Sequence, residues 1–209
     1  MSERAELVSI DPDAVCGFWF AGAGDDPERI GERQAVWYGG DPAFDEAVRV
    51  RFEEYVDPAA RGELDHWHAT PRGTLALIVL LDQMPRHVWR GSARAFAHDR
   101  VALALARDAL ARGVDRELRV IERLFVLLPL QHAEDAAVQA ESVSRHAALV
   151  AEAPAALTGV CEGSLAYARE HRDLIDRFGR FPHRNAVLGR APTPEEQEFL
   201  AAGGARFGQ

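Results

Sequence analysis

Apolar residues recur along much of the chain at the spacing of one face of an α-helix. Phe44, Val48, Phe52 and Tyr55 are three or four residues apart, and the segment 93–112 shows the same spacing. Because an α-helix completes a turn every 3.6 residues, such positions fall on one side of it. The chain is also rich in Ala, the strongest helix former, and poor in Thr and Ile, which favour strands. The pattern predicts a protein built of amphipathic helices.

Six Asp-Pro or Thr-Pro pairs predict where helices begin. The Asp or Thr oxygen can accept a hydrogen bond from a free amide of the first turn, and Pro is tolerated at the first helical position. Thr193 is also followed by Glu196, which completes a capping box. The six pairs are Asp11-Pro12, Asp26-Pro27, Asp41-Pro42, Asp57-Pro58, Thr70-Pro71 and Thr193-Pro194.

Further helices are expected from periodicity and from the glycines that can end them. They cover residues 93–112, 115 to about 128, 133–152 and 155–178, with Gly113 and Gly179 after the first and the last. Loops are expected at 22–26, 37–40, 85–92 and 180–192, the third because Pro85 should interrupt a helix. The sequence therefore predicts an all-α fold, a single-domain helical bundle of stacked helix hairpins over residues 1–209 with short loose termini.

Charge and composition exclude several classes of function. All 24 basic residues are Arg, against 33 acidic residues and a net charge of −9. Without Lys there is no Schiff-base or phosphate-loop lysine, and the acidic balance argues against nucleic-acid binding. The longest apolar run, 75–81, is too short to cross a bilayer, and residues 1–15 lack the apolar stretch of a secretory signal. We expect a cytoplasmic protein that binds neither nucleic acid nor membrane, with Cys16 and Cys161 as buried thiols.

The helix expected over 133–152 carries a stripe of polar side chains between its apolar and its charged face. The stripe consists of His132, Asp135, Gln139, Ser142 and His146, with Glu134 on the adjoining charged face. In one interpretation the stripe is a wall of a cleft in which His132 and Asp135 form an oriented acid/base pair. In the other it is ordinary polarity at the edge of a packed face, with no chemical role.

A second polar group interrupts the apolar helix at residues 80–90. Asp82, Gln83 and Arg86 follow directly after the apolar run, next to Pro85. Asp82 and Arg86 can form an ion pair that fastens the end of a helix. Alternatively, the carboxylate and the guanidinium group face a ligand.

The third candidate is the basic segment 177–190, which contains no acidic residue. Its polar residues are Arg177, Arg180, His183, Arg184, Asn185 and Arg190. Arg recognises phosphate and carboxylate groups with a planar fork of two donors, so the segment is a candidate anion site. The alternative is a structural clamp in which these arginines pair with carboxylates of the same chain.

Metal or cofactor binding is not expected. A metal site that combines His132, Glu134 or Asp135 with His171 is chemically permissible, but the spacing matches no known ligand signature. His171 shares a helix face with apolar residues, which is typical of a core histidine.

The polar segments also carry a resemblance to a known family. The chain resembles the bacterial family catalogued as domain of unknown function 924 in the stretches FWF (18–20), LALIVLLDQMPRHVWRG (75–91), AFAHD (95–99), PLQHAED (129–135), HRDLIDRFGRFPHRNAVLGR (171–190) and TPEE (193–196). The resemblance implies an all-helical fold similar to tetratricopeptide-repeat (TPR) proteins, and it implies no established activity. Met84 and His87 depart from the family, which usually has Phe and Asn at these positions.

Two functions remain open from the sequence. The first is a polar pocket for a small anionic ligand, for binding alone or for acid/base catalysis. Arg177, Arg180 and Arg184 would hold the anion, and His132 would move a proton with Asp135 or Asp82. The remaining contacts would come from Gln83, Arg86, Glu134, Gln139, His183 and Asn185. The second function is a TPR-like module that binds a peptide or protein partner, in which the polar motifs only stabilise the fold.

Overall fold

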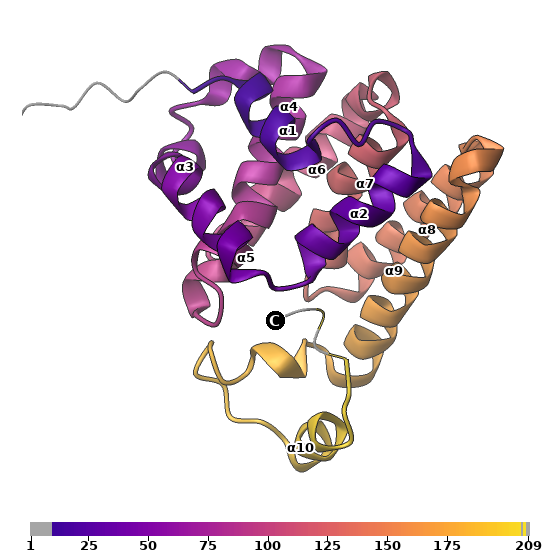
Figure 1. The fold of residues 1–209 in the computed structure, drawn as a ribbon. Helices are drawn as coiled ribbons and strands as arrows, with labels where there is room; N and C mark the ends of the chain where they lie inside the picture. Colours follow the sequence, from indigo (N-terminus) through magenta and orange to yellow (C-terminus); the bar gives the residue numbers. More distant parts are fainter. Residues whose placement is uncertain (1–9, 206, 208–209) are drawn as a thin grey trace, which may run out of the picture.

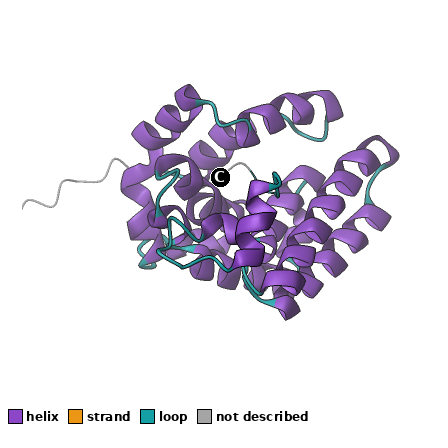
Figure 2. Cartoon of the chain, turned by 90° about the horizontal axis from the view of Figure 1, so that it is seen from below, coloured by secondary structure: helices purple, strands orange, loops and turns teal. Residues whose placement is uncertain are grey.

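The computed structural model describes residues 10–205 and 207, and within this part of the chain the regular structure is helical and contains no strand (Figure 1, Figure 2). The all-α class is therefore confirmed. The expected loose termini and most of the stretch tested for a secretory signal fall on residues 1–9 and 208–209, outside the described residues. The α-helices are α1 (Pro12–Phe20), α2 (Pro27–Tyr38), α3 (Pro42–Ala60), α4 (Pro71–Ile78), α5 (Met84–Val88), α6 (Asp99–Arg112), α7 (Val120–Gln131), α8 (Ala136–Glu152), α9 (Thr158–Phe178) and α10 (Pro194–Ala201).

Short helical turns connect several of these elements. The 3-10 turns are η1 (Asp65–Ala69), η3 (Ala93–Phe96), η4 (Val114–Glu117), η5 (Ala155–Leu157) and η6 (Pro182–Arg184), and η2 (Val79–Gln83) is a π-helical turn.

Five of the six expected helix starts are confirmed. At each, the side-chain oxygen accepts a hydrogen bond from an amide of the first helical turn, and Pro follows the cap. The capping residues are Asp11, Asp26, Asp41, Thr70 and Thr193. Thr193 and Glu196 form the expected capping box of α10.

The sixth start, at Asp57-Pro58, is wrong. Pro58 lies inside the last turn of α3, because the buried face that includes Val56 and Ala59 carries the helix past it. Asp57 instead accepts hydrogen bonds from Arg94 at 2.7 Å and from His98 at 3.1 Å. An Asp-Pro pair thus marks a helix start only where no buried face continues through it.

A single long helical segment, α4–η2–α5, runs through the middle of the molecule. Every residue from 73 to 87 in it is buried, and α1, α3, α6 and α7 pack against it. The expected break at Pro85 does not occur. Pro85 has no N–H to continue the α-helical hydrogen bonds, and the turn before it widens so that the Met84 amide donates to the Val79 carbonyl five residues back. This π turn is where Asp82 and Gln83 lie.

Several helix boundaries differ from the sequence prediction. The helix expected over 93–112 begins at Asp99, after the 3-10 turn η3. The helix expected from Asp115 begins only at Val120, where the Glu122 carboxylate accepts a hydrogen bond from the Arg119 amide at 3.1 Å. The helix expected over 133–152 begins at residue 136, with Asp135 as its cap. His132 therefore belongs to the end of α7, and the helical stripe that was expected to include it does not exist as one face.

Helices α6 to α9 pack against one another in chain order, and α8 and α9 run side by side along one edge of the molecule (Figure 1). After α9 the chain turns at Gly179 and returns beneath the other helices, through η6, to α10 (Figure 1). Phe181, Leu174 and Ile175 form a small second core there, apart from the main one. Both cysteines are buried free thiols. Among residues 10–205 and 207, no helix combines the length and apolar character needed to cross a bilayer.

Candidate functional site

Asp82 is the centre of a buried polar network in the π turn. Its side chain is fully buried, and its Oδ1 accepts a hydrogen bond from Nδ1 of His132 at 2.8 Å. The Gln83 amide donates to Oδ2, and the Arg86 guanidinium lies 3.7 Å from Oδ1. Burial acts to raise the pKa of Asp82, but His132 and Arg86 outweigh it and hold the pKa below its usual range. Asp82 is therefore an anion that fixes the orientation of the His132 ring.

Asp99, the first residue of α6, binds two arginines from distant parts of the chain. Arg86 donates to both of its carboxylate oxygens, at 2.9 and 3.0 Å, and Arg184 of η6 donates to one of them at 3.3 Å. Arg184 also donates to the His132 carbonyl at 3.1 Å. We call Asp82, Arg86, Asp99, His132 and Arg184 the cavity cluster.

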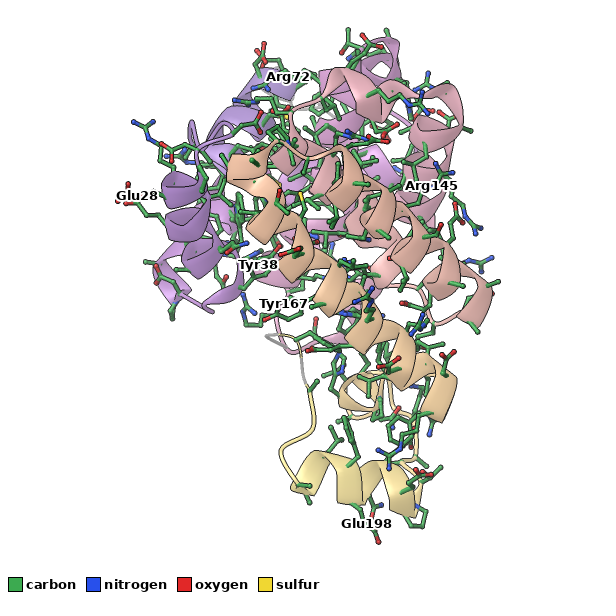
Figure 3. All side chains as sticks on the ribbon, turned by 90° about the vertical axis from the view of Figure 1, so that its right-hand side faces the viewer. Glu28, Tyr38, Arg72, Arg145, Tyr167 and Glu198 are labelled. Atoms are coloured by element: carbon green, nitrogen blue, oxygen red, sulfur yellow. The ribbon has the colours of Figure 1, made fainter. Side chains whose placement is uncertain are left out.

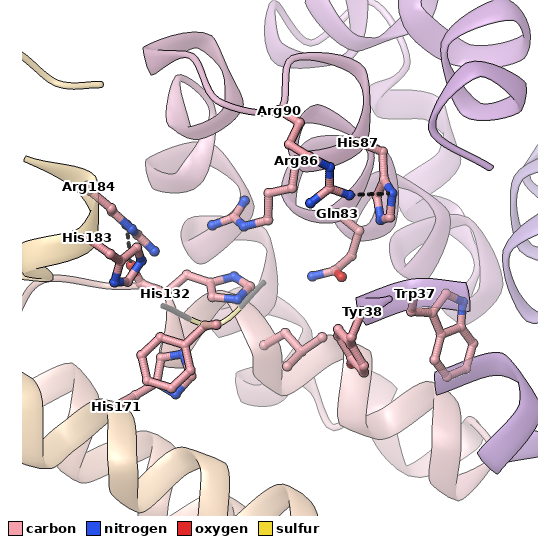
Figure 4. Close-up of a pocket in the computed structure, with 12 residues that line it drawn as sticks. Trp37, Tyr38, Gln83, Arg86, His87, Arg90, His132, His171, His183 and Arg184 are labelled. Atoms are coloured by element: carbon pink, nitrogen blue, oxygen red, sulfur yellow. Dashed lines mark hydrogen bonds between the residues drawn. The ribbon is translucent and has the colours of Figure 1, made fainter. Parts of the chain in front are cut away.

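The cavity cluster borders a cavity of about 60 Å³, which has room for several water molecules and hence for a small oxyanion. The side chains point into it from α2, η2, α5, α7, α9 and the C-terminal segment (Figure 4). The lining residues are Trp37, Tyr38, Gln83, Arg86, His87, Arg90, Leu128, His132, His171, His183, Arg184 and Phe207.

A second carboxylate orients a second imidazole at the edge of the cavity. Asp45 of α3 lies 2.7 Å from Nδ1 of His87 and accepts two hydrogen bonds from Arg90, at 2.7 and 2.9 Å. The three guanidinium groups that line the cavity, those of Arg86, Arg90 and Arg184, are thus matched by three carboxylates, those of Asp45, Asp82 and Asp99. The charge of the site is then set by its histidines.

Three of the lining histidines, His87, His132 and His171, favour the neutral form. Burial, reinforced by Arg86, lowers the pKa of His132, and burial also lowers the pKa of His87. Burial and the proximity of His132 lower the pKa of His171 to about 3. Nδ1 of His171 donates to the Tyr167 carbonyl at 2.8 Å, and the ring of Phe207 stacks on the imidazole at 3.7 Å between centroids. At neutral pH, His87, His132 and His171 are neutral imidazoles beside buried guanidinium groups.

One nitrogen of His132 is left for a ligand. With Nδ1 bound to Asp82, the ring carries its proton on that side, and the hydrogen bond to Asp82 is the one that the His132 ring makes within the described part of the chain. A neutral imidazole held this way by a carboxylate is suited to accept a proton from a bound molecule. The partner that the structure supplies is Asp82, and not Asp135.

Several residues that the sequence nominated lie elsewhere. Asp135 accepts from the Val138 amide at 2.9 Å as the cap of α8, so its oxygen serves the helix rather than His132. Gln139 is fully buried and donates to backbone carbonyls at the end of α7, among them those of Gln131 and Ala133 at 2.7 Å. Ser142 and His146 are buried with it, so this part of the expected stripe packs against α7 and lines no cleft.

The basic segment divides into two parts. Arg177 pairs with Glu195 at 2.8 Å, Arg180 pairs through two donors with Glu196 at 2.6 and 2.8 Å, and Arg190 pairs with Glu134 at 2.6 and 3.0 Å. We call these three pairs the C-terminal clamp. Asn185 donates to Glu196 at 3.2 Å and belongs with it. Arg177 and Arg180 therefore do not line the cavity with Arg184 but pair with Glu195 and Glu196. Arg184 and His183 alone reach the cavity from this segment.

Sequence reasoning missed Asp99, His87, Tyr38 and Phe207. Asp99 stands at a helix start, where an acidic residue needs no further explanation. A buried Arg86 needs a carboxylate partner, and this requirement could have pointed to Asp99. The sequence contains 33 acidic residues, however, and does not show which of them is the partner. Among the described residues, no group of three or more His, Cys, Asp or Glu side chains is arranged to hold a metal ion.

Comparison with known proteins shows that the similarity of this chain to a bacterial protein family includes the residues of the site. The model of a family of bacterial proteins of unknown function, DUF924, matches residues 15–204, which include every residue of the cavity cluster. The solved structure of ATU0120, a protein of unknown function from Agrobacterium tumefaciens, is 38% identical, with a TM-score of 0.73 over 90% of this chain and 99% of that one. No match was found among the curated proteins. The chain therefore belongs to the DUF924 family of bacterial proteins of unknown function.

Proposed function

We propose that the cavity binds a small oxyanion, a phosphate, sulfate or carboxylate group, and that His132 exchanges a proton with the bound molecule. The observation that carries this proposal is the shared carboxylate in the cavity cluster. Asp99 accepts hydrogen bonds from both Arg86 and Arg184, which are both buried, and Asp82 is the second carboxylate beside Arg86. Arg184 is left with an Nε–H that has no hydrogen-bond partner among the described residues.

The cost of burying Arg184 is only partly offset by the protein itself. Burial lowers the pKa of Arg184 to about 10 although Asp99 acts to raise it. A buried cation that lacks full compensation is stabilised by an anion placed beside it, and a guanidinium group offers donors that fit two oxygens of such an anion. The interaction between the anion and Arg184 would then contribute to the free energy of ligand binding.

The Asp82–His132 pair supplies the acid/base part of the proposal. A neutral His132 accepts a proton when an acidic group binds beside Nε2, and the resulting imidazolium is stabilised by Asp82 at 2.8 Å from Nδ1. Arg86 and Gln83 hold Asp82 in place from the other side. This is the arrangement of an oriented base, for binding with proton uptake or for a proton-transfer reaction.

A panel of inorganic phosphate, sulfate, acetate and succinate tests anion binding by thermal unfolding and calorimetry. An anion at about one hundred times its Kd stabilises the native state by about 2.7 kcal/mol, which for a chain of this length raises the Tm by about 5–10 °C. We expect Arg184→Gln to weaken binding at least about tenfold. Arg177→Gln is the matched control, because it alters an exposed arginine of the C-terminal clamp. No saturable stabilisation by any anion, or equal losses in both variants, contradicts the proposal.

Proton exchange is tested with sulfate or acetate, neither of which titrates near neutral pH. Because a bound anion favours the imidazolium form, affinity should rise as the pH falls from about 8 to about 6. The variant His132→Asn keeps a donor for Asp82 but cannot titrate, so its affinity should not depend on pH in this range. An unchanged pH dependence in this variant would assign the proton to another group.

The alternative function, a TPR-like interaction module, has one observation in its favour, since α6 to α9 pack in chain order like stacked helix hairpins. Such a module presents an open apolar groove to its partner. The large apolar side chains most open to solvent in the described chain are few, Tyr38, Val50, Val101 and Tyr167, and they come from four different helices. We favour the ligand pocket for this reason. If the wild type and Arg184→Gln capture the same protein partner in a pull-down, the partner does not bind through the pocket, and this result would support the interaction module.

A further inference from the structure

The two exposed tyrosines of the described chain lie close to each other, and one of them, Tyr38, lines the cavity. Tyr38 and Tyr167 have 53% and 59% of their surface exposed, more than any other large aromatic side chain in residues 10–205 and 207. Tyr38 is the last residue of α2 and lines the cavity. Tyr167 lies one turn before His171 on α9, so both project from the same face of that helix.

Tyr38 and Tyr167 are neighbours, and we call the exposed side of the cavity at Tyr38 its entrance. In Figure 3 the side chains of Tyr38 and Tyr167 lie next to each other, one from each of two helices that are far apart in sequence. Electrostatic interactions connect Tyr38 with Tyr167 and with Asp82 inside the cavity. Two exposed aromatic side chains therefore lie near the charged groups of the cavity cluster.

Exposed aromatic side chains at a cavity entrance are typical of contact with a ring. A tyrosine offers a flat, rigid apolar face with few rotatable bonds, and aromatic rings attract each other in offset or edge-on arrangements. The cavity of about 60 Å³ holds an oxyanion but little more, so the rest of a larger ligand would lie at the entrance. Most residues that line the cavity are polar, whereas Tyr38 and Tyr167 offer aromatic rings to a ligand.

We propose that the ligand has two parts, an oxyanion beside Arg184 and a planar ring held between Tyr38 and Tyr167 at the entrance. This inference rests on the proposed function, because it assumes that the oxyanion occupies the cavity. It adds the chemical class of the ligand, an aromatic or heterocyclic phosphate or carboxylate. Tyr38 and Tyr167 would then determine specificity.

Matched pairs of probes separate the ring from the anion. Phenyl phosphate and methyl phosphate carry the same anionic group, as do benzoate and acetate. For the wild type we expect the aryl member of a pair to bind about 2- to 12-fold more tightly, as a favourable aromatic contact predicts. Calorimetry measures all four, and fluorescence of Trp37 in the cavity wall provides a second readout.

Substitutions then assign the preference to the two tyrosines. Tyr38→Ala and Tyr167→Ala should each reduce the ratio of the affinities for phenyl and methyl phosphate, and the double variant should abolish the preference. Arg184→Gln should weaken both members of a pair equally. Val50→Ala, at an exposed apolar position of α3 with no part in the cavity lining, is the control.

The outcomes distinguish this inference from the proposed function. If phenyl and methyl phosphate bind the wild type equally, or if the double tyrosine variant keeps the preference, the ring contact is wrong and the oxyanion site stands. If no phosphate or carboxylate probe binds at all, the oxyanion site is overturned and the ring contact with it.

Discussion

In the C-terminal clamp each arginine has a carboxylate of its own, whereas in the cavity cluster Arg86 and Arg184 share Asp99. The clamp pairs lie at exposed or half-exposed positions, apart from the buried Glu196. The groups of the cavity cluster are almost completely buried. The two regions use the same residue types and even share one stretch of sequence, 177–190.

The comparison teaches what distinguishes a structural ion pair from a candidate binding site. A guanidinium group that meets its own carboxylate through two donors has little left to offer a ligand. A buried guanidinium group that shares a carboxylate beside a cavity retains a donor without a partner, as Arg184 does with its Nε–H in the part of the chain that the structure describes. The difference lies in burial beside a cavity and in the sharing of Asp99, and not in the number of arginines in the segment.

The largest effect is expected from Asp82→Ala, which leaves His132 and Arg86 without their central partner. Removing one member of a buried charged network costs about 3–5 kcal/mol of unfolding free energy, because the remaining charge stays buried. Urea unfolding followed by circular dichroism measures it. The control Asp82→Asn keeps an acceptor for His132 and should lose less. A loss for Asp82→Ala below about 1 kcal/mol would show that the network is not tightly coupled to the fold.

The two regions should also lose stability in different pH ranges. His171 has a pKa lowered to about 3, so its contribution to stability is complete above the ordinary value of 6.5 and is lost as the pH falls from there towards 3. The unfolded chain takes up the proton first, and the loss of stability between about pH 6.5 and 4 is on the order of 3 kcal/mol. His171→Asn, which can still donate to the Tyr167 carbonyl, should flatten the decline of stability between about pH 6.5 and 4.

The clamp should respond only at lower pH. The hydrogen bonds from Arg180 lower the pKa of Glu196 to about 2, so its contribution is complete above about 4.5 and is lost as the pH falls through 2. Unfolding curves from pH 7 to 2 for the wild type and for His171→Asn check both windows. If His171→Asn flattens the decline below pH 4 instead, the two regions are not independent.

The smallest effects should come from the clamp at neutral pH. Glu196 accepts hydrogen bonds from Arg180, Asn185 and the Thr193 amide, and it is buried. Glu196→Gln should therefore cost about 2 kcal/mol. Glu195→Gln removes only an exposed pair with Arg177 and should cost less than about 1 kcal/mol. Urea unfolding of the two variants ranks them, and equal losses would contradict the assignment of Glu196 as the buried centre of the clamp.

Local features of the sequence were enough for most of the helices. Asp11, Asp26, Asp41, Thr70 and Thr193 cap helices as expected, because a cap depends on residues within one turn of the chain. Where the prediction was wrong, at Asp57-Pro58 and Pro85, burial against other helices had overridden the local signal. A buried face continues past Pro58, and a widened turn accommodates Pro85.

The candidate site could be predicted only in part. Asp82, Gln83, Arg86, His132, His183 and Arg184 were nominated from the sequence and do lie at the cavity or in contact with it. Asp135, Gln139, Arg177 and Arg180 were nominated by the same criteria and serve as a cap, a buried hydrogen-bond donor and clamp residues. Polar residue types in a pattern identify groups that need partners, but they do not say which partners.

The sequence by itself determined the all-α class, the capped helix starts and the family, because each depends on neighbouring residues or on the order of motifs. Only the tertiary structure decided that His132 binds Asp82 rather than Asp135, and that Arg184 reaches the cavity while Arg177 and Arg180 do not. Asp82 and His132 are 50 residues apart, and Arg184 and Asp99 are 85 apart. Contacts over such separations follow from how helices pack, and packing depends on the shape and burial of all their side chains together.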